Sequence, residues 1–311
     1  MYHPPIPPNQ KETKQKSFFQ TIKRRKVASK GLQYPSNEAQ FSLKKTLLNF
    51  EFPEGIVDFE DHIASSWAEL TRPLFSLGND EYLVSLIDLK SIDDRLPEAE
   101  HRRLELLSGG QFQFAWLSDS IIDAFLFTLC RERLSVLHVK NIIVQEVLKE
   151  DVDLDINDFW HLNFTGRTHI YIPYNSGNHW VSILVHLETK TITFLDPNRP
   201  PDSSADSLLH IFSFGQRLRN PIHHSFVRQM KLVLGHILKR DMQSWCVEIP
   251  LKQSVQKDGV NCGVFICWYL DRFLKNEPYH MTADLDTHSY RRQMIEAMIN
   301  VVNDESTNID P

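Results

Sequence analysis

The segment at residues 168–197 most constrains the fold, because its apolar residues alternate with polar or mixed residues in two runs separated by a short turn at residues 188–190. The first run is Val181, Ile183, Val185 and Leu187, and the second run is Ile192 and Phe194. An alternation with period two is typical of β-strands, since successive side chains point to opposite faces of a sheet. The segment therefore predicts two antiparallel strands joined by a hairpin.

Two polar residues flank this hairpin at its open end. His179 comes just before the first strand and Asp196 ends the second. The start of one antiparallel strand faces the end of the next, so we expect the two side chains to face each other across the ladder. An aspartate that accepts from one imidazole nitrogen leaves the other free to take the proton of a nucleophile. An exposed histidine and an ordinary acidic turn residue before Pro197 are the alternative interpretation.

Cys262 offers the nucleophile for such a pair, because it lies just before an apolar segment that is predicted to be a buried helix. The apolar face of that helix comprises Val264, Phe265, Trp268, Tyr269 and Phe273. Helix N-termini carry partial positive charge and unpaired N–H groups, which stabilise a thiolate. Cys262, His179 and Asp196 are thus a candidate catalytic triad. A packed core cysteine is the alternative, since free cysteine is among the most buried residue types.

Four separated motifs, in this order, resemble those of the Ulp/SENP family of ubiquitin-like-protein cysteine proteases. They are Trp-Leu-Ser-Asp at residues 116–119 before an apolar helix, His-Trp at 179–180, Asp196, and Gln-x-x-Gly-x-Asn-Cys-Gly at 256–263. The resemblance extends from about Trp116 to about Met298. It implies the papain-like α+β fold of that family, in which helices flank a central mixed sheet.

The resemblance also implies a catalytic role for each matching residue. Cys262 would be the nucleophile, His179 its general base and then acid, and Asp196 the residue that orients the imidazole. Gln256 matches the glutamine that forms the family's oxyanion hole together with the backbone N–H of Cys262. Such donors stabilise the negative charge of a tetrahedral intermediate.

Three further residues match the family's substrate-binding positions. Trp116 and Trp180 match the indoles that enclose the Gly-Gly tail of the modifier, and Asp119 matches a residue that contacts the modifier itself. Core packing is the alternative for both tryptophans. The chain departs from the family at Asn261, because many members have aspartate immediately before the nucleophile. We interpret this departure as the mark of a divergent member.

The implied reaction is hydrolysis after the C-terminal Gly-Gly of a ubiquitin-like modifier, and SUMO is the favoured modifier. The expected partners are therefore the modifier and its conjugates, and no cofactor is expected. Ubiquitin or another modifier is an alternative substrate. Acetyl transfer by the same triad is a further alternative, as is an inactive module that binds a modifier.

Composition excludes several other classes of protein. With 311 residues, of which 41% are hydrophobic, the chain can bury a sizeable core. No apolar run approaches the roughly twenty residues of a membrane span, and the N-terminus lacks the apolar region of a secretory signal, so we expect an intracellular protein. Its four cysteines lack paired spacing, which argues against disulfides and a zinc site. The scattered histidines predict no metal site.

The chain divides into four predicted segments. Residues 1–40 are basic and contain several prolines, so we expect disorder there. Residues 41–107 form a partly helical extension that packs on the catalytic domain at 108–300, and residues 301–311 form a polar tail. The basic cluster at 23–26 resembles a nuclear import signal, although a solvated tail explains it equally well. We do not expect nucleic-acid binding.

Overall fold

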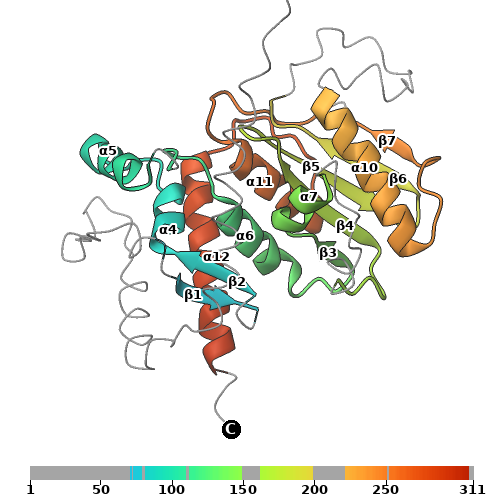
Figure 1. Cartoon of the computed structure of the whole chain (residues 1–311), viewed down its shortest axis with the longest axis horizontal. Helices are drawn as coiled ribbons and strands as arrows, with labels where there is room; N and C mark the ends of the chain where they lie inside the picture. Colours follow the sequence, from blue (N-terminus) through green and yellow to red (C-terminus); the bar gives the residue numbers. More distant parts are fainter. Residues whose placement is uncertain are drawn as a thin grey trace, which may run out of the picture. The chain divides into compact units, whose positions relative to one another are not determined.

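The computed structural model describes residues 71, 73–78, 81–109, 112–148, 162–198, 221–250 and 252–307, all within a compact unit that runs from Asp58 to Pro311. The predictions for residues 1–40 and the basic cluster at 23–26 lie outside these ranges. The elements in chain order are β1 (Pro73–Leu77), β2 (Tyr82–Ser85), α4 (Leu86–Ile92), α5 (Glu98–Leu107), α6 (Asp119–Cys130), β3 (Val136–His138), α7 (Asn141–Val147), β4 (His169–Asn175), β5 (Trp180–His186), β6 (Thr191–Leu195), α10 (Pro221–Leu238), β7 (Cys246–Glu248), α11 (Cys262–Leu274) and α12 (Thr287–Thr307) (Figure 1).

A mixed five-stranded sheet, in the order β3-β4-β5-β6-β7, forms the centre of this unit. Strand β5 is antiparallel to both of its neighbours, β4 and β6, whereas β3 runs parallel to β4 and β7 runs parallel to β6. The predicted hairpin is β5–β6, and the predicted α+β architecture with a mixed sheet and flanking helices is confirmed.

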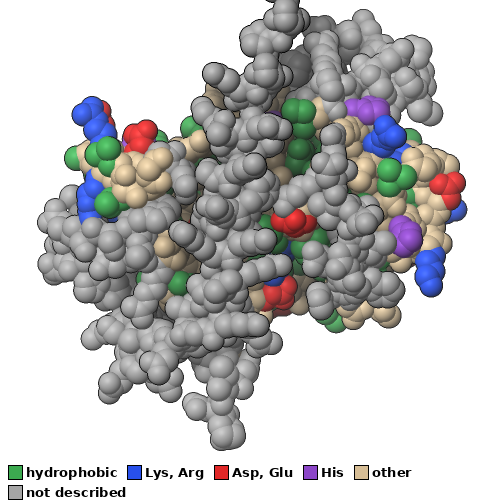
Figure 2. All heavy atoms as spheres, in the orientation of Figure 1, with side chains coloured by type: hydrophobic (Ala, Val, Ile, Leu, Met, Phe, Trp, Pro, Cys, Tyr) green, Lys and Arg blue, Asp and Glu red, His purple; other side chains and the backbone are tan. Residues whose placement is uncertain are grey.

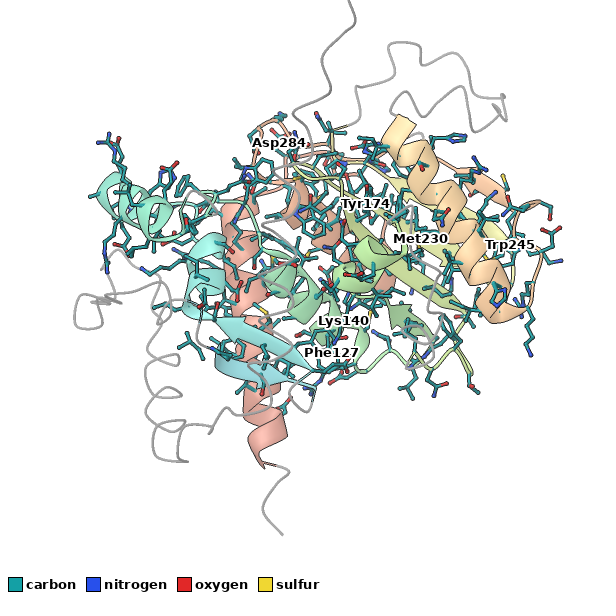
Figure 3. The ribbon with its side chains drawn as sticks, in the orientation of Figure 1. Phe127, Lys140, Tyr174, Met230, Trp245 and Asp284 are labelled. Carbon is teal, nitrogen blue, oxygen red and sulfur yellow. The ribbon has the colours of Figure 1, made fainter. Side chains whose placement is uncertain are left out.

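Helix α10 packs against one face of the sheet and α7 lies beside it (Figure 1). Tyr174 of β4 stacks on Phe226 of α10 with ring centroids 4.4 Å apart. Met230 and Trp245 belong to the same core cluster, and Figure 3 shows Tyr174, Met230 and Trp245 along this side of the sheet. The alternating apolar residues of β5 and β6 form the sheet side of this cluster.

Helix α11 covers the opposite face, so that β4 and β5 are buried on both sides. The hydroxyl of Tyr171 in β4 donates to the carbonyl oxygen of Ile266 in α11 over 2.5 Å. Helix α11 begins at Cys262, as the sequence predicts, and its neighbours are α6, α12 and β5. The nucleophile candidate therefore lies at a helix end that the sheet and two helices hold in place.

The described part of the predicted extension contains α4 and α5 and, in addition, an antiparallel hairpin of β1 and β2. The hairpin was not predicted because only the last residue of β1 is buried, so its sequence carries no alternation. It packs on α6 and α12. At its end, Tyr82 stacks on Phe127 and lies beneath the ammonium of Lys140 (Figure 3).

Charged residues of both signs lie together on α5 (Figure 2). Arg102 pairs with Glu98 and Arg103 pairs with Glu100 along the helix.

Within the described ranges, none of the helices combines the length and the apolar character that crossing a membrane requires.

Candidate active site

His179 and Asp196 form a hydrogen bond of 2.7 Å between Nε2 and Oδ1. The sequence predicts that the two side chains face each other directly across the ladder. In the structure their contact is diagonal instead. The last β5–β6 pair is Ser182 with Leu195, and the same register would set Asp196 opposite Val181, two residues from His179. Strand β6 ends early because Pro197 has no N–H to donate to a ladder. Diagonal neighbours on one face still lie within reach of long side chains.

Cys262 lies near enough to His179 to act on the pKa of its imidazole. Nε2 of the imidazole binds Asp196, so Nδ1 is the ring nitrogen left to accept a proton from the thiol. Burial disfavours the charged imidazolium, but the hydrogen bonds to Asp196 and Cys262 outweigh it and raise the pKa of His179 to about 9. The imidazole is therefore protonated at neutral pH, which favours an imidazolium beside the sulfur.

Asp196 is held in its charged form by several donors. Burial raises its pKa, but the hydrogen bond and charge of His179 and the backbone N–H of Asn198 lower that pKa below the ordinary value. The amide of Gln253 donates to the carbonyl oxygen of Asp196, and Nδ1 of His223 on α10 lies 3.8 Å from Oδ2. Neither Gln253 nor His223 was singled out from the sequence, because nothing in their spacing marks this contact.

Gln256 lies on the loop that leads into α11, next to the end of β6. Its backbone N–H donates to the carbonyl oxygen of Pro197 over 2.8 Å, which ties the loop to the residue after Asp196. Its side-chain Oε1 is buried, and no hydrogen-bond partner for this atom occurs among the described residues. Lys257, the next residue, pairs with Asp284 on the surface (Figure 3).

The two candidate tunnel tryptophans differ in environment. Trp180 is 1% exposed, and its Cδ1 would lie 3.4 Å from a Cβ placed on Gly263, so it packs against the first turn of α11. Trp116 is half-buried and faces an open hollow of about 670 Å³. The hollow is lined by His101, Glu105, Phe112, Gln113, Phe114, Trp116, Asn178 and Gly259. It reaches the neighbour of His179 but does not include Trp180.

Asp119 is the first residue of α6. The hydroxyl of Ser118 caps this helix by accepting from the backbone N–H of Ile121 over 3.3 Å. Asp119 is partly exposed there, and its contact with a modifier remains a prediction.

Cys262 is buried, as Cys130 and Cys267 are, and differs from the other thiols in that it begins α11. All four cysteines are free, and burial raises the pKa of Cys130 to about 12 and that of Cys267 well above its ordinary range. Cys246 is exposed on β7. The described residues contain no group of three His, Cys, Asp or Glu side chains that could hold a metal ion.

Comparisons with known proteins identify the same family as the motifs. The model of the Ulp1 protease family, C-terminal catalytic domain, matches residues 152–304, a range that holds the candidate triad and Gln256 but not Trp116 and Asp119. Ubiquitin-like-specific protease 1C of Arabidopsis thaliana is 22% identical over 129 residues, which are 37% of this chain. The match spans about a fifth (21%) of that relative's length.

Solved structures of Ulp1 share the fold. The C-terminal Ulp1 protease domain in complex with Smt3, the yeast ortholog of SUMO, is 14% identical, covers 88% of this chain and 99% of its own, and has a TM-score of 0.53. SUMO protease Ulp1 with its catalytic cysteine oxidised to a sulfenic acid is 13% identical, covers 88% and 97%, and has a TM-score of 0.54. The family match over residues 152–304, the motifs and this shared fold together indicate a divergent member of the Ulp/SENP family of cysteine proteases.

Proposed function

We propose that this protein is a cysteine protease that hydrolyses the bond after the C-terminal Gly-Gly of a ubiquitin-like modifier, and that the modifier is SUMO. The observation that carries the proposal is the imidazole of His179, which hydrogen-bonds to Asp196 and whose pKa is raised in part by Cys262 at the start of α11. Orientation by a carboxylate and activation by an adjacent base are what a cysteine nucleophile requires.

The first half of the reaction would form an acyl-enzyme. The Cys262 thiolate attacks the carbonyl carbon of the terminal glycine, and the carbonyl oxygen becomes an oxyanion. Protonated His179 then gives its proton to the leaving amine as the C–N bond breaks, leaving a thioester. Asp196 stabilises the imidazolium before this transfer, and the amine departs neutral.

The second half would return the free enzyme. Neutral His179 takes a proton from water, the hydroxide attacks the thioester carbonyl, and the C–S bond breaks to release the modifier's carboxylate and the Cys262 sulfur. In both halves the oxyanion would accept hydrogen bonds from the backbone N–H of Cys262 and the side chain of Gln256. Loss of one such donor typically slows acyl transfer by about a hundredfold or more.

The hollow beside Trp116 supports a slender substrate tail at this site. Its lining includes Asn178, which precedes His179, Gly259, three residues before Cys262, and His101 and Glu105 of α5. The indole of Trp116 offers a flat face in this hollow, against which a tail without side chains could lie. The 88% coverage by a Ulp1 domain bound to Smt3 supports SUMO as the first modifier to test.

A panel of modifier probes tests both the chemistry and the modifier. SUMO, ubiquitin and other ubiquitin-like modifiers with C-terminal vinyl sulfones would be incubated with the wild type, Cys262→Ala and Cys246→Ala. We expect a SUMO adduct in the wild type and in Cys246→Ala, and no adduct in Cys262→Ala. Cys246→Ala is the control because the thiol of Cys246 is exposed on β7 in the wild type. Preferential labelling by ubiquitin would reassign the modifier. An adduct on another cysteine, or none with any modifier, would contradict the proposed protease.

A further inference from the structure

We propose that Arg291 of α12 is a positioning residue for catalysis, which joins the loop that presents the nucleophile to the loop that presents Trp116. Its side chain is 2% exposed. Its guanidinium donates to groups on three separate segments: Asn261, Ala115 and the C-terminal end of α4. A planar fork of five N–H donors can bind several acceptors at once, which a lysine ammonium cannot reproduce in the same geometry.

The first of these contacts is to the residue immediately before the nucleophile. Oδ1 of Asn261 accepts from Nε of Arg291 over 3.1 Å and from Nη2 over 2.8 Å. On its other side, Nδ2 of Asn261 donates to Oδ2 of Asp258 over 2.8 Å. Asp258 also accepts from the backbone N–H groups of Val260 and Asn261 through Oδ1, each over 2.9 Å.

The departure of Asn261 from the family's aspartate therefore has a structural function. An amide can accept from Arg291 and donate to Asp258 at the same time, whereas a carboxylate at this position could only accept. A second carboxylate would also face that of Asp258 at hydrogen-bond distance. The chain Arg291–Asn261–Asp258 thus sets the backbone from which α11 and Cys262 start.

The second contact is to the residue before Trp116. The carbonyl oxygen of Ala115 accepts from Nη2 of Arg291 over 2.5 Å. Ala115 has a φ of 58°, in the left-handed region that a residue with a Cβ seldom adopts unless its surroundings hold it there. The same guanidinium donates through Nη1 to the carbonyl oxygens of Ser91 and Ile92, over 3.3 and 3.0 Å.

The charge of Arg291 also lies near the candidate site. Its nearest carboxylate oxygen among the described residues, Oδ2 of Asp94, is 3.9 Å away, at the edge of a direct ion pair. Most of its partners are neutral carbonyl groups and the amide of Asn261. A buried guanidinium held in this way keeps both loops in one arrangement, since removing any acceptor would leave a buried charged donor unsatisfied.

This inference rests on the proposed function, so its test separates the two. Wild type, Arg291→Lys and Arg291→Gln would be assayed on SUMO carrying a C-terminal 7-amido-4-methylcoumarin, with competent sites counted by SUMO vinyl sulfone. We expect kcat per titrated site to fall at least tenfold in both variants. Arg240→Gln is the control, because Arg240, although exposed, also donates to a backbone carbonyl, that of Leu187, away from the site. A purely structural role would lower the number of competent sites and leave kcat per site unchanged.

An exchange of side chains tests the Asn261 bridge directly. Asn261→Asp alone sets two carboxylates against each other, and we expect kcat per site to fall at least fivefold. In Asp258→Asn with Asn261→Asp, the new amide at 258 can donate to the new carboxylate at 261, so kcat per site should return to within about twofold of the wild type. Failure of the exchange to restore the rate would contradict the bridge.

Alkylation of Cys262 by iodoacetamide needs no modifier and covers the case in which SUMO is not the substrate. We expect the rate of Cys262 alkylation, resolved by mass spectrometry, to fall at least fivefold in Arg291→Lys. Equal alkylation rates, or an unchanged kcat per titrated site, would overturn the role of Arg291. Absence of SUMO turnover by the wild type would contradict only the proposed function.

Discussion

The pKa of His179 links the candidate site to the stability of the fold. The two hydrogen bonds raise this pKa from 6.5 to about 9 despite burial. A group whose pKa rises on folding stabilises the folded state fully below its unfolded pKa, and that contribution is lost as the pH rises through the folded value. We therefore expect the free energy of unfolding of the wild type to decline between about pH 6.5 and 9.

Urea denaturation across this pH range, with His179→Gln as the comparison, measures that contribution. The variant should lack the part of the decline that comes from residue 179, and its kcat should fall by about a hundredfold or more because the acid and base are removed. Parallel stability curves for the two proteins would show that His179 is not held protonated by the fold.

The two tryptophans are expected to respond differently to truncation. Trp180→Ala removes a 1% exposed side chain from beneath α11, and such substitutions typically cost about 3–5 kcal/mol of stability. Trp116→Ala removes a half-buried side chain from the hollow, so it should lower kcat/KM on SUMO substrates with a smaller loss of stability. Thermal melts run beside the assays separate the effects.

Substrates with altered tails test the same hollow from the other side. If Trp116 faces the Gly-Gly tail, a SUMO substrate ending in Gly-Ala should be cleaved at least tenfold more slowly than one ending in Gly-Gly. Two results would contradict the placement of Trp116 beside the tail: similar cleavage rates for the two tails, or a melting temperature that falls equally in Trp116→Ala and Trp180→Ala.

At the scale of elements, the first turn of α11 packs so closely on its neighbours that a side chain at residue 263 would crowd them. A methyl group at Gly263 would lie 3.0 Å from Cδ1 of Ile122, 3.2 Å from Cβ of Leu117 and 3.4 Å from Cδ1 of Trp180. Alanine normally favours a helix interior by up to about 1 kcal/mol over glycine. Here we expect Gly263→Ala to lower kcat by at least fivefold, because the new methyl group would crowd Ile122 and Leu117 and so shift the start of α11 relative to α6.

A second substitution provides the matched rescue. Ile122→Val removes the Cδ1 atom that the new methyl group would meet first, so Gly263→Ala with Ile122→Val should recover most of the lost activity. Steady-state rates and melting temperatures of the two single variants and the double variant measure the coupling. Additive effects would show that the contact with Ile122 is not the cause.

The elements that the sequence predicted are those in which a periodic apolar pattern was recognised, and the 18-residue α10 and the seven-residue β4 were not among them. Strands β5 and β6 alternate, and α6 and α11 present wide apolar faces, so their types and approximate bounds follow from periodicity. Strands β3 and β7 have only three residues each, too few for a pattern to appear. Their existence depends on pairing with β4 and β6, which local sequence does not encode.

The same distinction applies to the site. The sequence brought His179 and Asp196 together because both lie at the ends of one hairpin. Gln253 and Arg291 were missed because they act mainly through backbone carbonyl groups, and every residue type provides such an acceptor. The near-complete burial of Trp180 could not be predicted from the motif match either. A motif specifies the residue type but not which face of the indole a helix covers.

At the scale of the whole described unit, the hairpin and α4 support a site to which they contribute no candidate catalytic residue. Asp88 of α4 receives hydrogen bonds from the backbone N–H of Ser85 over 2.9 Å and from the hydroxyl of Ser118 over 2.7 Å. Ser118 in turn caps α6, directly after the Trp116 loop. Asp88→Ala should cost about 2–3 kcal/mol in urea denaturation, since hydrogen bonds to charged groups contribute about 1.5–3 kcal/mol each.

Truncation tests whether this support is essential. A fragment of residues 108–311 keeps every candidate catalytic residue but loses β1, β2 and α4, whose buried Leu77, Val84 and Ile92 lie in the part of the unit that packs on α6 and α12. It also loses the Ser91 and Ile92 carbonyl groups that accept from Arg291, so a buried guanidinium would lack two of its acceptors.

We expect this fragment to unfold without cooperativity and to be inactive, whereas residues 58–311, the compact unit, should melt and turn over like the full chain. Thermal melts, dye binding and SUMO cleavage of the two fragments measure this difference. A cooperative, active fragment of 108–311 would show that the candidate site is held by the sheet, α6 and α11 alone.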